Sequence, residues 1–156
     1  MIPGQFDYVR PSDLGEALQI LADREGEAKV LSGGYSLIPL LKHQNMKIVI
    51  DTASVLGQLH YRDGLPELEK MLEATGNNDL KQTTLQAISR IGDPSSENIM
   101  KKYFSSGDKT LRQYAVEGFG RMKLESYLDP LKREFQREDS RRIKLAICFS
   151  LFALGD

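Results

Sequence analysis

The sequence predicts a mainly α-helical protein, an α-solenoid of helix hairpins with a small β-α-β fragment at its N-terminus. Three observations lead to this prediction: an apolar pattern that returns every 31 or 32 residues, turn residues at the expected helix ends, and a different pattern in the first 42 residues. Internal repeats of this length are typical of solenoid folds. We therefore expect two domains, residues 1–42 and residues 43–156.

The repeat is carried by apolar or small residues at offsets 0, +4, +7, +8 and +11 from four starting points, Ile48, Leu80, Leu111 and Ile143. These offsets lie on one side of a helix, because each residue advances the helix by about 100°. We expect units at about 43–79, 80–110 and 111–142 and an incomplete unit at 143–156. The stretch MKIVIDT also reads as a strand because it contains Ile48, Val49 and Ile50, but its register with the repeat favours a helix.

A second helix follows in three of the four units, at GLPELEKMLEA, SSENIMKKYFSS and SYLDPLKREFQR. Its core positions also align, as Leu68, Met100 and Leu131 and then as Leu72, Phe104 and Phe135. Between the helices, IGDPSS places Gly92 at the end of one helix and Pro94 near the start of the next. Each complete unit is therefore predicted to be a helix hairpin.

The last unit has a first helix but no second one, and two expectations concern this first helix. At offset +5 the four units carry Ala53, Leu85, Val116 and Cys148, so Cys148 is predicted to be a packed core thiol rather than a nucleophile. The same helix would leave Ile147, Leu151 and Leu154 without cover. Exposed apolar surface of this kind predicts self-association through the C-terminal helix.

The sequence IGDP at residues 91–94 and the sequence LGD at residues 154–156 give the array a family resemblance. Together with the period, they resemble HEAT repeats of the PBS-lyase-like variety over about residues 47–156. HEAT arrays serve as scaffolds, lyases, regulatory subunits and nucleic-acid binders. The resemblance therefore implies the fold, and we expect a non-enzymatic protein–protein interaction or scaffold module.

Charge gives one candidate binding feature. The chain as a whole has a net charge of −1, which offers no global attraction to nucleic acid or to an anionic membrane. At offset +1, Lys81, Arg112 and Lys144 would place a cation at the same point of successive units, where an acidic peptide or a phosphate backbone could bind. From residue 43 onward 17 cations accompany 16 acids, with no aromatic ladder, which argues against nucleic acid and favours a protein partner.

The first segment has another character. FDYVRP reads as a strand, Ser12 or Asp13 would cap a helix with the apolar face Leu14, Ala17, Leu18 and Leu21, and AKVL reads as a second strand that runs into SGGYS. A strand, helix, strand and glycine loop in this order could begin a nucleotide-binding unit. Two adjacent glycines let backbone N–H groups converge on a diphosphate, although general turn chemistry by itself favours an ordinary turn.

The phrases IPGQFDYVRP, LGEALQILA and LSGGYSLIPLLK make this segment more specific. They resemble the N-terminus of the FAD-binding medium subunit of carbon monoxide dehydrogenase and related molybdenum hydroxylases. The resemblance stops near Lys42, before the family's second flavin loop, so the chain resembles a chimera of a truncated flavin domain and a repeat array. It implies that the following residues correspond to the loop at the FAD diphosphate, with Ser32 in place of the usual alanine: Val30, Leu31, Ser32, Gly33, Gly34, Tyr35, Ser36 and Leu37.

An FAD-binding fragment of an oxidoreductase is therefore the alternative function, and without it we expect no cofactor. No catalytic or metal site is predicted, because His43 and His60 have no accompanying cluster of acids. One cysteine, no apolar run of roughly 18 residues and no signal peptide lead us to expect a cytoplasmic protein without a membrane span. We also expect the first segment to pack on the first hairpin through Leu14, Leu18, Leu21, Leu37 and Leu41.

Overall fold

The computed structural model describes residues 9–12, 14–24 and 37–155, and the structural statements below concern these residues. They form eight α-helices and four short 3₁₀ helices, with no β-strand among them. The chain divides into two compact units, residues 1–33 and residues 34–156. Each unit is described separately.

In the first unit, helix α1 (Leu14–Asp23) lies where the sequence predicts a helix. The backbone N–H and the hydroxyl of Ser12 both donate to Glu16 Oε2 at 2.6 Å, which fixes the start of α1. The predicted β-α-β fragment is not seen. Val9 and Arg10, in the first expected strand, have no strand structure, and the second expected strand lies outside the described residues. Pro11 offers no N–H for a ladder, and a short strand without neighbours is not stable by itself.

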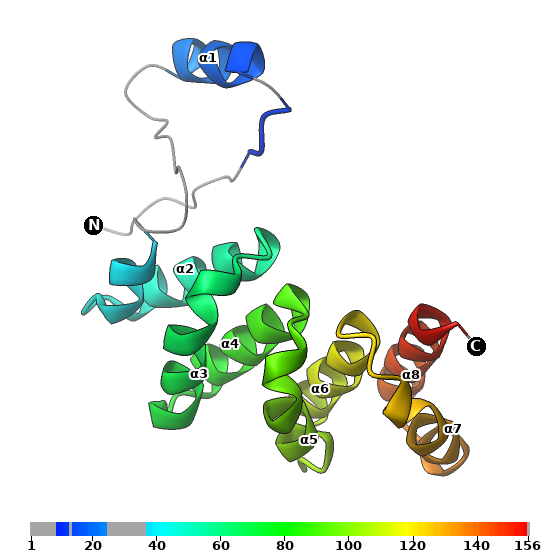
Figure 1. Cartoon of the computed structure of the whole chain (residues 1–156). Helices are drawn as coiled ribbons and strands as arrows, with labels where there is room; N and C mark the ends of the chain where they lie inside the picture. The colour runs from blue at the N-terminus through cyan, green and yellow to red at the C-terminus, as the bar shows by residue number, and fades with distance from the viewer. Residues whose placement is uncertain (1–8, 13, 25–36, 156) are drawn as a thin grey trace. The chain divides into compact units, whose positions relative to one another are not determined.

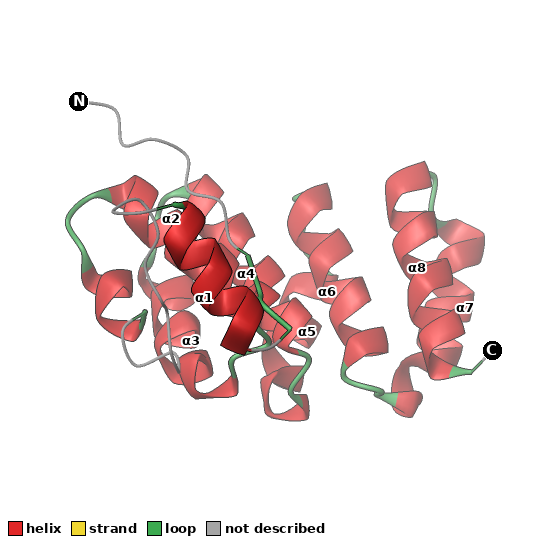
Figure 2. Ribbon diagram, turned by 90° about the horizontal axis from the view of Figure 1, so that it is seen from above, coloured by secondary structure: helices red, strands yellow, loops and turns green. Residues whose placement is uncertain are grey.

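The second unit is the predicted solenoid of helix hairpins (Figure 1). Its first helices are α2 (Met46–Gln58), α4 (Asn78–Ile91), α6 (Lys109–Arg121) and α8 (Arg141–Leu154), and each packs on the next. Figure 2 shows α4, α6 and α8 running side by side in one layer. The second helices α3 (Leu65–Ala74), α5 (Glu97–Phe104) and α7 (Leu128–Arg137) pack on α4, α6 and α8 in turn.

Short 3₁₀ helices make the connections. η2 (Arg62–Gly64), η3 (Pro94–Ser96) and η4 (Glu125–Tyr127) lead from the first helix of each hairpin into the second. η1 (Ile38–Lys42) precedes the array and packs on α2 and α3. Leu37 and Leu41, two of the five leucines expected to face the array, are buried there, whereas the side chains of the other three lie outside the described residues.

The predicted periodicity locates the core. Positions +4 and +7 are buried in all four first helices, and Leu68, Met100 and Leu131 are fully buried at the aligned position of the second helices. The strand alternative for MKIVIDT is wrong, because α2 begins at Met46 and Asn45 caps it. A helix forms here because Val49, Thr52 and Ala53 share one buried face at helical spacing.

Each first helix begins with the same arrangement. The N-cap residue donates its backbone N–H to the side chain two positions earlier, at 2.7–3.2 Å. The four pairs are Asn45 with His43, Asn77 with Thr75, Asp108 with Ser106, and Ser140 with Glu138. In three units the N-cap side chain also accepts N–H groups of the first helical turn. This repetition satisfies donors that a helix start leaves unpaired.

The ends of the first helices repeat as well. The described residues with positive φ are His60, Gly92, Lys123 and Gly155, which stand at the same position of the four units. Glycine adopts this left-handed conformation without strain. The side chains of His60 and Lys123 instead reach the first helix of the next unit. His60 Nδ1 lies 2.6 Å from Arg90 O in α4, and Lys123 Nζ donates to Ala153 O in α8. Both side chains therefore link the ends of neighbouring first helices.

The first helices approach each other closely at residues of minimal size. A Cβ atom on Gly57 would lie 2.6 Å from Ala87 Cα, and one on Gly120 would lie 2.7 Å from Ser150 Cα. At the middle junction, a Cβ on Gly118 would lie 3.4 Å from Ser89 Oγ. Each junction thus has glycine on one side, at offset +9 of one unit or at offset +7 of the next.

Two expectations about α8 are wrong. Cys148 is exposed, although Leu85 and Val116 at the same offset are fully buried. Of the three side chains expected to lack cover, Ile147 is fully buried, and Leu151 and Leu154 are half-buried. The large apolar side chains exposed on α8 are instead Leu145, Phe149 and Phe152. The reason is geometric: the repeat template follows the side that packs on the preceding unit, and the opposite side is covered only when another first helix follows.

Asp108 provides a test of the capping pattern. Backbone hydrogen bonds from Leu111 and Thr110 hold the pKa of its carboxyl below the usual range, despite some opposing desolvation. A lowered folded-state pKa stabilises the protein above the unfolded pKa of about 3.9, and this contribution is lost as the pH falls through the folded value. We expect Asp108→Ala to lower the free energy of unfolding by about 1 kcal/mol at pH 7.

The isosteric variant isolates the charge. The deficit of Asp108→Asn relative to wild type should shrink as the pH falls from 7 to about 3, below the unfolded carboxyl pKa. Urea unfolding across this range measures it, with Asp79→Asn, an exposed position in the first turn of α4, as the control. An Asp108→Asn deficit that does not change with pH would contradict this role of the carboxylate.

Candidate partner-binding surface

The three cations predicted to form a ladder lie at equivalent positions of α4, α6 and α8. Two of them interact with other residues of the array. Arg112 Nη2 lies 3.4 Å from Glu134 Oε1 and also forms an ion pair with Glu138, and Lys144 Nζ lies 5.3 Å from the ring centroid of Phe135. Lys81 is half-buried. Arg112 and Lys144 thus reach α7 and the turn after it.

Positive charge nevertheless gathers on the layer of first helices. α2, α4, α6 and α8 together carry nine Lys and Arg against three Asp and Glu, a net charge of +6, although the whole chain has a net charge of −1. The second helices α3, α5 and α7 carry six of each. Two of these nine cations, Arg112 and Lys144, turn toward α7, which leaves a net charge of +4 on the rest of the first-helix layer. The two layers still differ in charge, and the first-helix layer is the one suited to an acidic partner.

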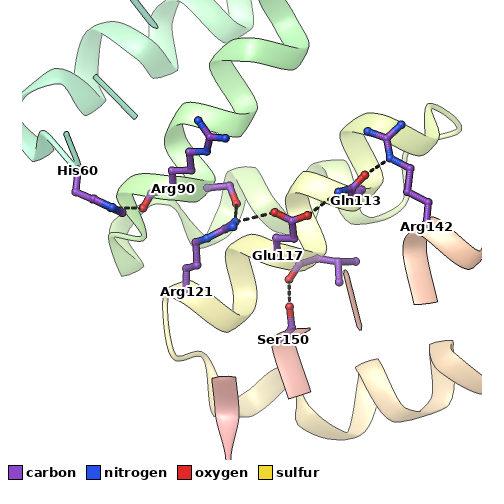
Figure 3. Close-up of polar contacts among 9 residues, drawn as sticks. His60, Arg90, Gln113, Glu117, Arg121, Arg142 and Ser150 are labelled. Carbon is purple, nitrogen blue, oxygen red and sulfur yellow. Dashed lines mark hydrogen bonds and ion pairs between the residues drawn. The ribbon is translucent and has the colours of Figure 1, made fainter. Parts of the chain in front are cut away.

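A chain of polar contacts crosses this layer (Figure 3). Arg121 Nη1 donates to Glu117 Oε2 at 2.9 Å and to Ser89 Oγ at 3.1 Å. Gln113 Nε2 donates to Glu117 Oε1 at 2.6 Å, and Gln113 Oε1 accepts from Arg142 Nε. Since residues 113, 117 and 121 follow one another at helical spacing, one side of α6 connects α4 with α8.

Glu117 is thereby neutralised by Arg121, whereas Arg142 has no ion-pair partner among the described residues. Besides Gln113, the described contact of its guanidinium is a 3.4 Å hydrogen bond from Nη1 to Thr110 Oγ1. No carboxylate oxygen among the described residues lies within ion-pair distance of Arg142, although Asp108 is near enough for Arg142 to favour its ionised form. Arg142 is therefore left without a direct ion pair among the described residues, and Asp108 acts on it only through space.

A groove of about 270 Å³ lies along these contacts and is called here the α6–α8 groove. It is lined by Gln113, Glu117, Arg121, Arg142, Leu145, Ala146 and Phe149. Arg121 Cζ lies 4.9 Å from the ring centroid of Phe149, a cation–π distance. The groove combines two guanidinium groups with the apolar surface of Leu145 and Phe149.

That apolar surface continues along α8. Leu145 is 72% exposed, Phe149 is 42% exposed and Phe152 is 81% exposed. These three residues, called here the α8 stripe, lie on one side of the helix because they are spaced at i, i+4 and i+7. Large apolar side chains grouped in this way on a surface indicate an interaction site.

Other candidate sites are weaker. A groove of about 420 Å³ between α3 and α5 is lined by both signs of charge, including Glu69, Lys70 and Glu73. The described residues hold no cluster of His, Cys, Asp or Glu suited to a metal ion. His43 and His60 both contact turn or helix-end backbone groups. None of the helices that the structure describes combines the length and apolar character needed to cross a bilayer.

The predicted FAD loop is largely outside the described residues, which include only Leu37 of residues 30–37. The side chain of Leu37 is 4% exposed and packs in the core. The geometry of the two glycines is not described.

Sequence reasoning missed the α6–α8 groove and the α8 stripe. A signal was present in the repeat columns. At offset +2 the units carry Ile50, Gln82, Gln113 and Leu145, and at offset +6 they carry Ser54, Gln86, Glu117 and Phe149. Both columns are polar in the two middle units and apolar in α8.

Comparison with known proteins gives two separate results. A family model described as HEAT repeats matches residues 65–152, which is more than half of the chain. The match begins at α3, and the structure shows that α2 continues the same packing toward the N-terminus.

The second result concerns the N-terminal region. It is 54% identical over 41 residues to the caffeine dehydrogenase subunit beta of Pseudomonas sp. strain CBB1, and 48% identical over 42 residues to the carbon monoxide dehydrogenase medium chain of Afipia carboxidovorans. The 6-hydroxypseudooxynicotine dehydrogenase complex subunit alpha of Paenarthrobacter nicotinovorans is 38% identical to the chain over 64 residues. These matches cover 26–40% of this chain but only 14–22% of the relatives.

Proposed function

The chain belongs to the HEAT repeat family, and from this premise we propose that its array is a non-enzymatic module that holds a partner protein. Solenoids of this kind use one extended face of stacked helices for binding. We assign the binding face to the first-helix layer formed by α2, α4, α6 and α8.

The observation that carries the proposal is the coincidence of charge and apolar surface on this layer. A net charge of +6 lies on the first helices, and the α8 stripe exposes two phenylalanines and a leucine beside it. Protein interfaces combine apolar anchors with a polar rim, and arginine is enriched among their energetically important residues. The second-helix layer has no net charge to attract a partner of either sign.

A displayed library of random 12-residue peptides, selected on the immobilised full chain, tests this function. We expect peptides that bind wild type and the double variant Lys101→Glu/Arg133→Glu of the second-helix layer, but that lose binding to Arg90→Glu/Arg142→Glu of the first-helix layer. Both variants change the charge by the same amount, and circular dichroism confirms their fold. Absence of enriched peptides, or the opposite dependence on the two variants, would refute the proposal.

A second candidate function has one observation in its favour, the identity of 48–54% between the N-terminal region and dehydrogenase subunits. The N-terminal region resembles FAD-binding medium subunits, and this resemblance would make residues 30–37 a cradle for the FAD diphosphate. FAD would then supply the redox chemistry, and this chain would bind it in that loop. A single loop gives the isoalloxazine ring few contacts, so a weakly held cofactor would be expected.

An absorbance spectrum between 350 and 500 nm, followed by titration with FAD, separates the two candidates. A scaffold is expected to be colourless and to leave the spectrum of added FAD unchanged. A flavin spectrum at near-unit stoichiometry, lost in Gly33→Val/Gly34→Val, would favour the dehydrogenase-type function instead.

A further inference from the structure

We propose that the α6–α8 groove and the α8 stripe bind an acidic peptide segment of a partner protein, one that carries aromatic or aliphatic side chains between its carboxylates. This inference rests on the proposed function and adds the chemistry of the partner and the place where it binds. Apolar side chains of the peptide would cover Leu145, Phe149 and Phe152, and its carboxylates would pair with Arg142 and with the arginines along the same layer.

The apolar part of the argument starts from the exposed surface of α8. In α2, α4 and α6, the side that corresponds to the α8 stripe is covered by the next first helix. Gly57, Ser89 and Gly120 at offset +9 permit this close approach. α8 carries Phe152 at that offset, and its ring does not fit the space that glycine or serine leaves at the other junctions. The α8 stripe therefore differs from a repeat junction and is suited to side chains that pack around a protruding phenylalanine.

The charge part of the argument concerns Arg121 and Arg142. Arg121 is held over the Phe149 ring by its bonds to Glu117 and Ser89, so its position is fixed before a ligand arrives. Arg142 is fixed by two neutral acceptors, Gln113 and Thr110, and its charge is not compensated by an ion pair among the described residues. A carboxylate at the mouth of the groove would supply the direct ion pair that Asp108 does not make with Arg142, in a bidentate geometry that suits arginine.

Arg90 extends this positive surface toward α4. It stands on the last turn of α4, at the offset that Arg121 occupies in α6. The described residues give Arg90 no ion pair, whereas its backbone carbonyl is used by His60. Arg90, Arg121 and Arg142 thus lie along one side of α4, α6 and α8 (Figure 3). This arrangement fits an extended acidic segment rather than a single carboxylate.

A peptide is a better match for this surface than a nucleic acid. Single-stranded nucleic acids bind to grooves where exposed aromatic rings alternate with cations. Here Leu145 is aliphatic, and one face of Phe149 is covered by the Arg121 guanidinium.

The test is a selection from a peptide library in which acidic, neutral and basic residues compete equally, called here the charge-choice selection. A displayed library of 12-residue peptides fixes Phe or Leu at four positions and allows Asp, Glu, Asn, Gln, Lys and Arg equally at the others. On the full chain we expect Asp and Glu to outnumber Lys and Arg at least about tenfold among binders. The affinity of a synthetic binder should fall about tenfold or more in both Arg142→Glu and Phe152→Ser, as expected for a central interface residue.

Matched controls keep the result interpretable. Lys101→Glu on α5 makes the same charge change on the other layer and should leave affinity unchanged. Phe152 is largely exposed, so Phe152→Ser should fold normally even if Arg142→Glu does not. Raising NaCl from 0.05 to 0.5 M should weaken an acidic binder, because exposed charges are screened.

Each other outcome has a definite meaning. Enriched peptides that are neutral or basic, or that bind Phe152→Ser as well as wild type, would overturn this inference and leave the proposed function intact. Absence of any enriched peptide from both libraries would overturn the two together. Tight binding of a 20-nucleotide single-stranded DNA with the same dependence on Arg142 and Phe152, or a dimer in sedimentation that Phe152→Ser dissociates, would assign the surface to nucleic acid or to a second copy instead.

Discussion

Replacing Gly120 by valine is expected to lower the free energy of unfolding by about 3 kcal/mol, the upper part of the usual range for overpacking. A Cβ atom at this position would lie 2.7 Å from Ser150 Cα and 3.0 Å from both side-chain atoms of Ser150. The nearest atom belongs to the backbone of α8, so no rotamer change removes the clash. α8 would have to move away from α6, which would open the fully buried core around Val116 and Ile147.

Urea unfolding measures this cost, and two further variants make the test specific. Gly57→Val should be similarly costly, because a Cβ there would lie 2.6 Å from Ala87 Cα at the α2–α4 junction. Gly107→Ala should change stability by less than about 0.5 kcal/mol, since no atom lies within 4 Å of its added Cβ. A Gly120→Val protein as stable as wild type would mean that α6 and α8 do not approach as described.

Phe119→Ala is expected to have the largest effect of any single truncation, about 3–5 kcal/mol. Phe119 is fully buried and lies at the centre of an aromatic group. Its ring stacks on Tyr127 with centroids 3.8 Å apart, and it meets the edge of Phe104 at 5.5 Å. Truncation leaves a cavity between α5, α6 and η4 and removes both ring contacts, which normally contribute beyond the buried area.

The matched control is an exposed phenylalanine of α8. Phe152→Ala removes the same side chain from an exposed position and should cost less than about 0.5 kcal/mol. The stability loss of Phe119→Leu should lie between those of the two alanine variants, since leucine retains much of the volume but not the ring contacts. Equal stability losses for Phe119→Ala and Phe152→Ala, measured by urea unfolding, would contradict the assigned core.

Periodicity was sufficient to predict the layers of the array, because every first helix repeats the same buried offsets. Turn chemistry was similarly informative: Gly92 ends α4 in the left-handed conformation, and Pro94 begins the short helix that leads into α5, both as predicted. These features are local in sequence, since a helix cap depends on residues within one turn. They therefore appear directly in the order of residues.

The candidate surface was less predictable for a physical reason. An offset fixes where a Cα lies on a helix, but a long side chain takes its partner from elsewhere. Arg112 was expected to face a ligand, yet Glu138 from the turn after α7 reaches it. Likewise, Gln113, Glu117 and Arg121 share one side of α6 visibly in sequence, but the contact with Arg142 crosses 29 residues of chain.

The exposure of α8 illustrates a related limit. Cys148 and Val116 occupy the same column, and nothing in the column itself shows that one is covered and the other is not. Burial depends on whether a further helix packs on that side. In the first segment, the capping residues and the apolar face predicted a helix that is present at α1, whereas the sheet expected around it is not seen among the described residues.

Amide hydrogen exchange of the full chain, with and without a saturating acidic binder from the charge-choice selection, tests the central claim most directly. The claim is that the first-helix layer is the surface that holds a partner. We predict slower exchange in residues 109–121 and 141–154, which form α6 and α8, with little change in α3, α5 and α7. Protection confined to α3, α5 and α7, or to residues 30–37, would contradict the claim and move the binding site to the other layer or to the N-terminal segment.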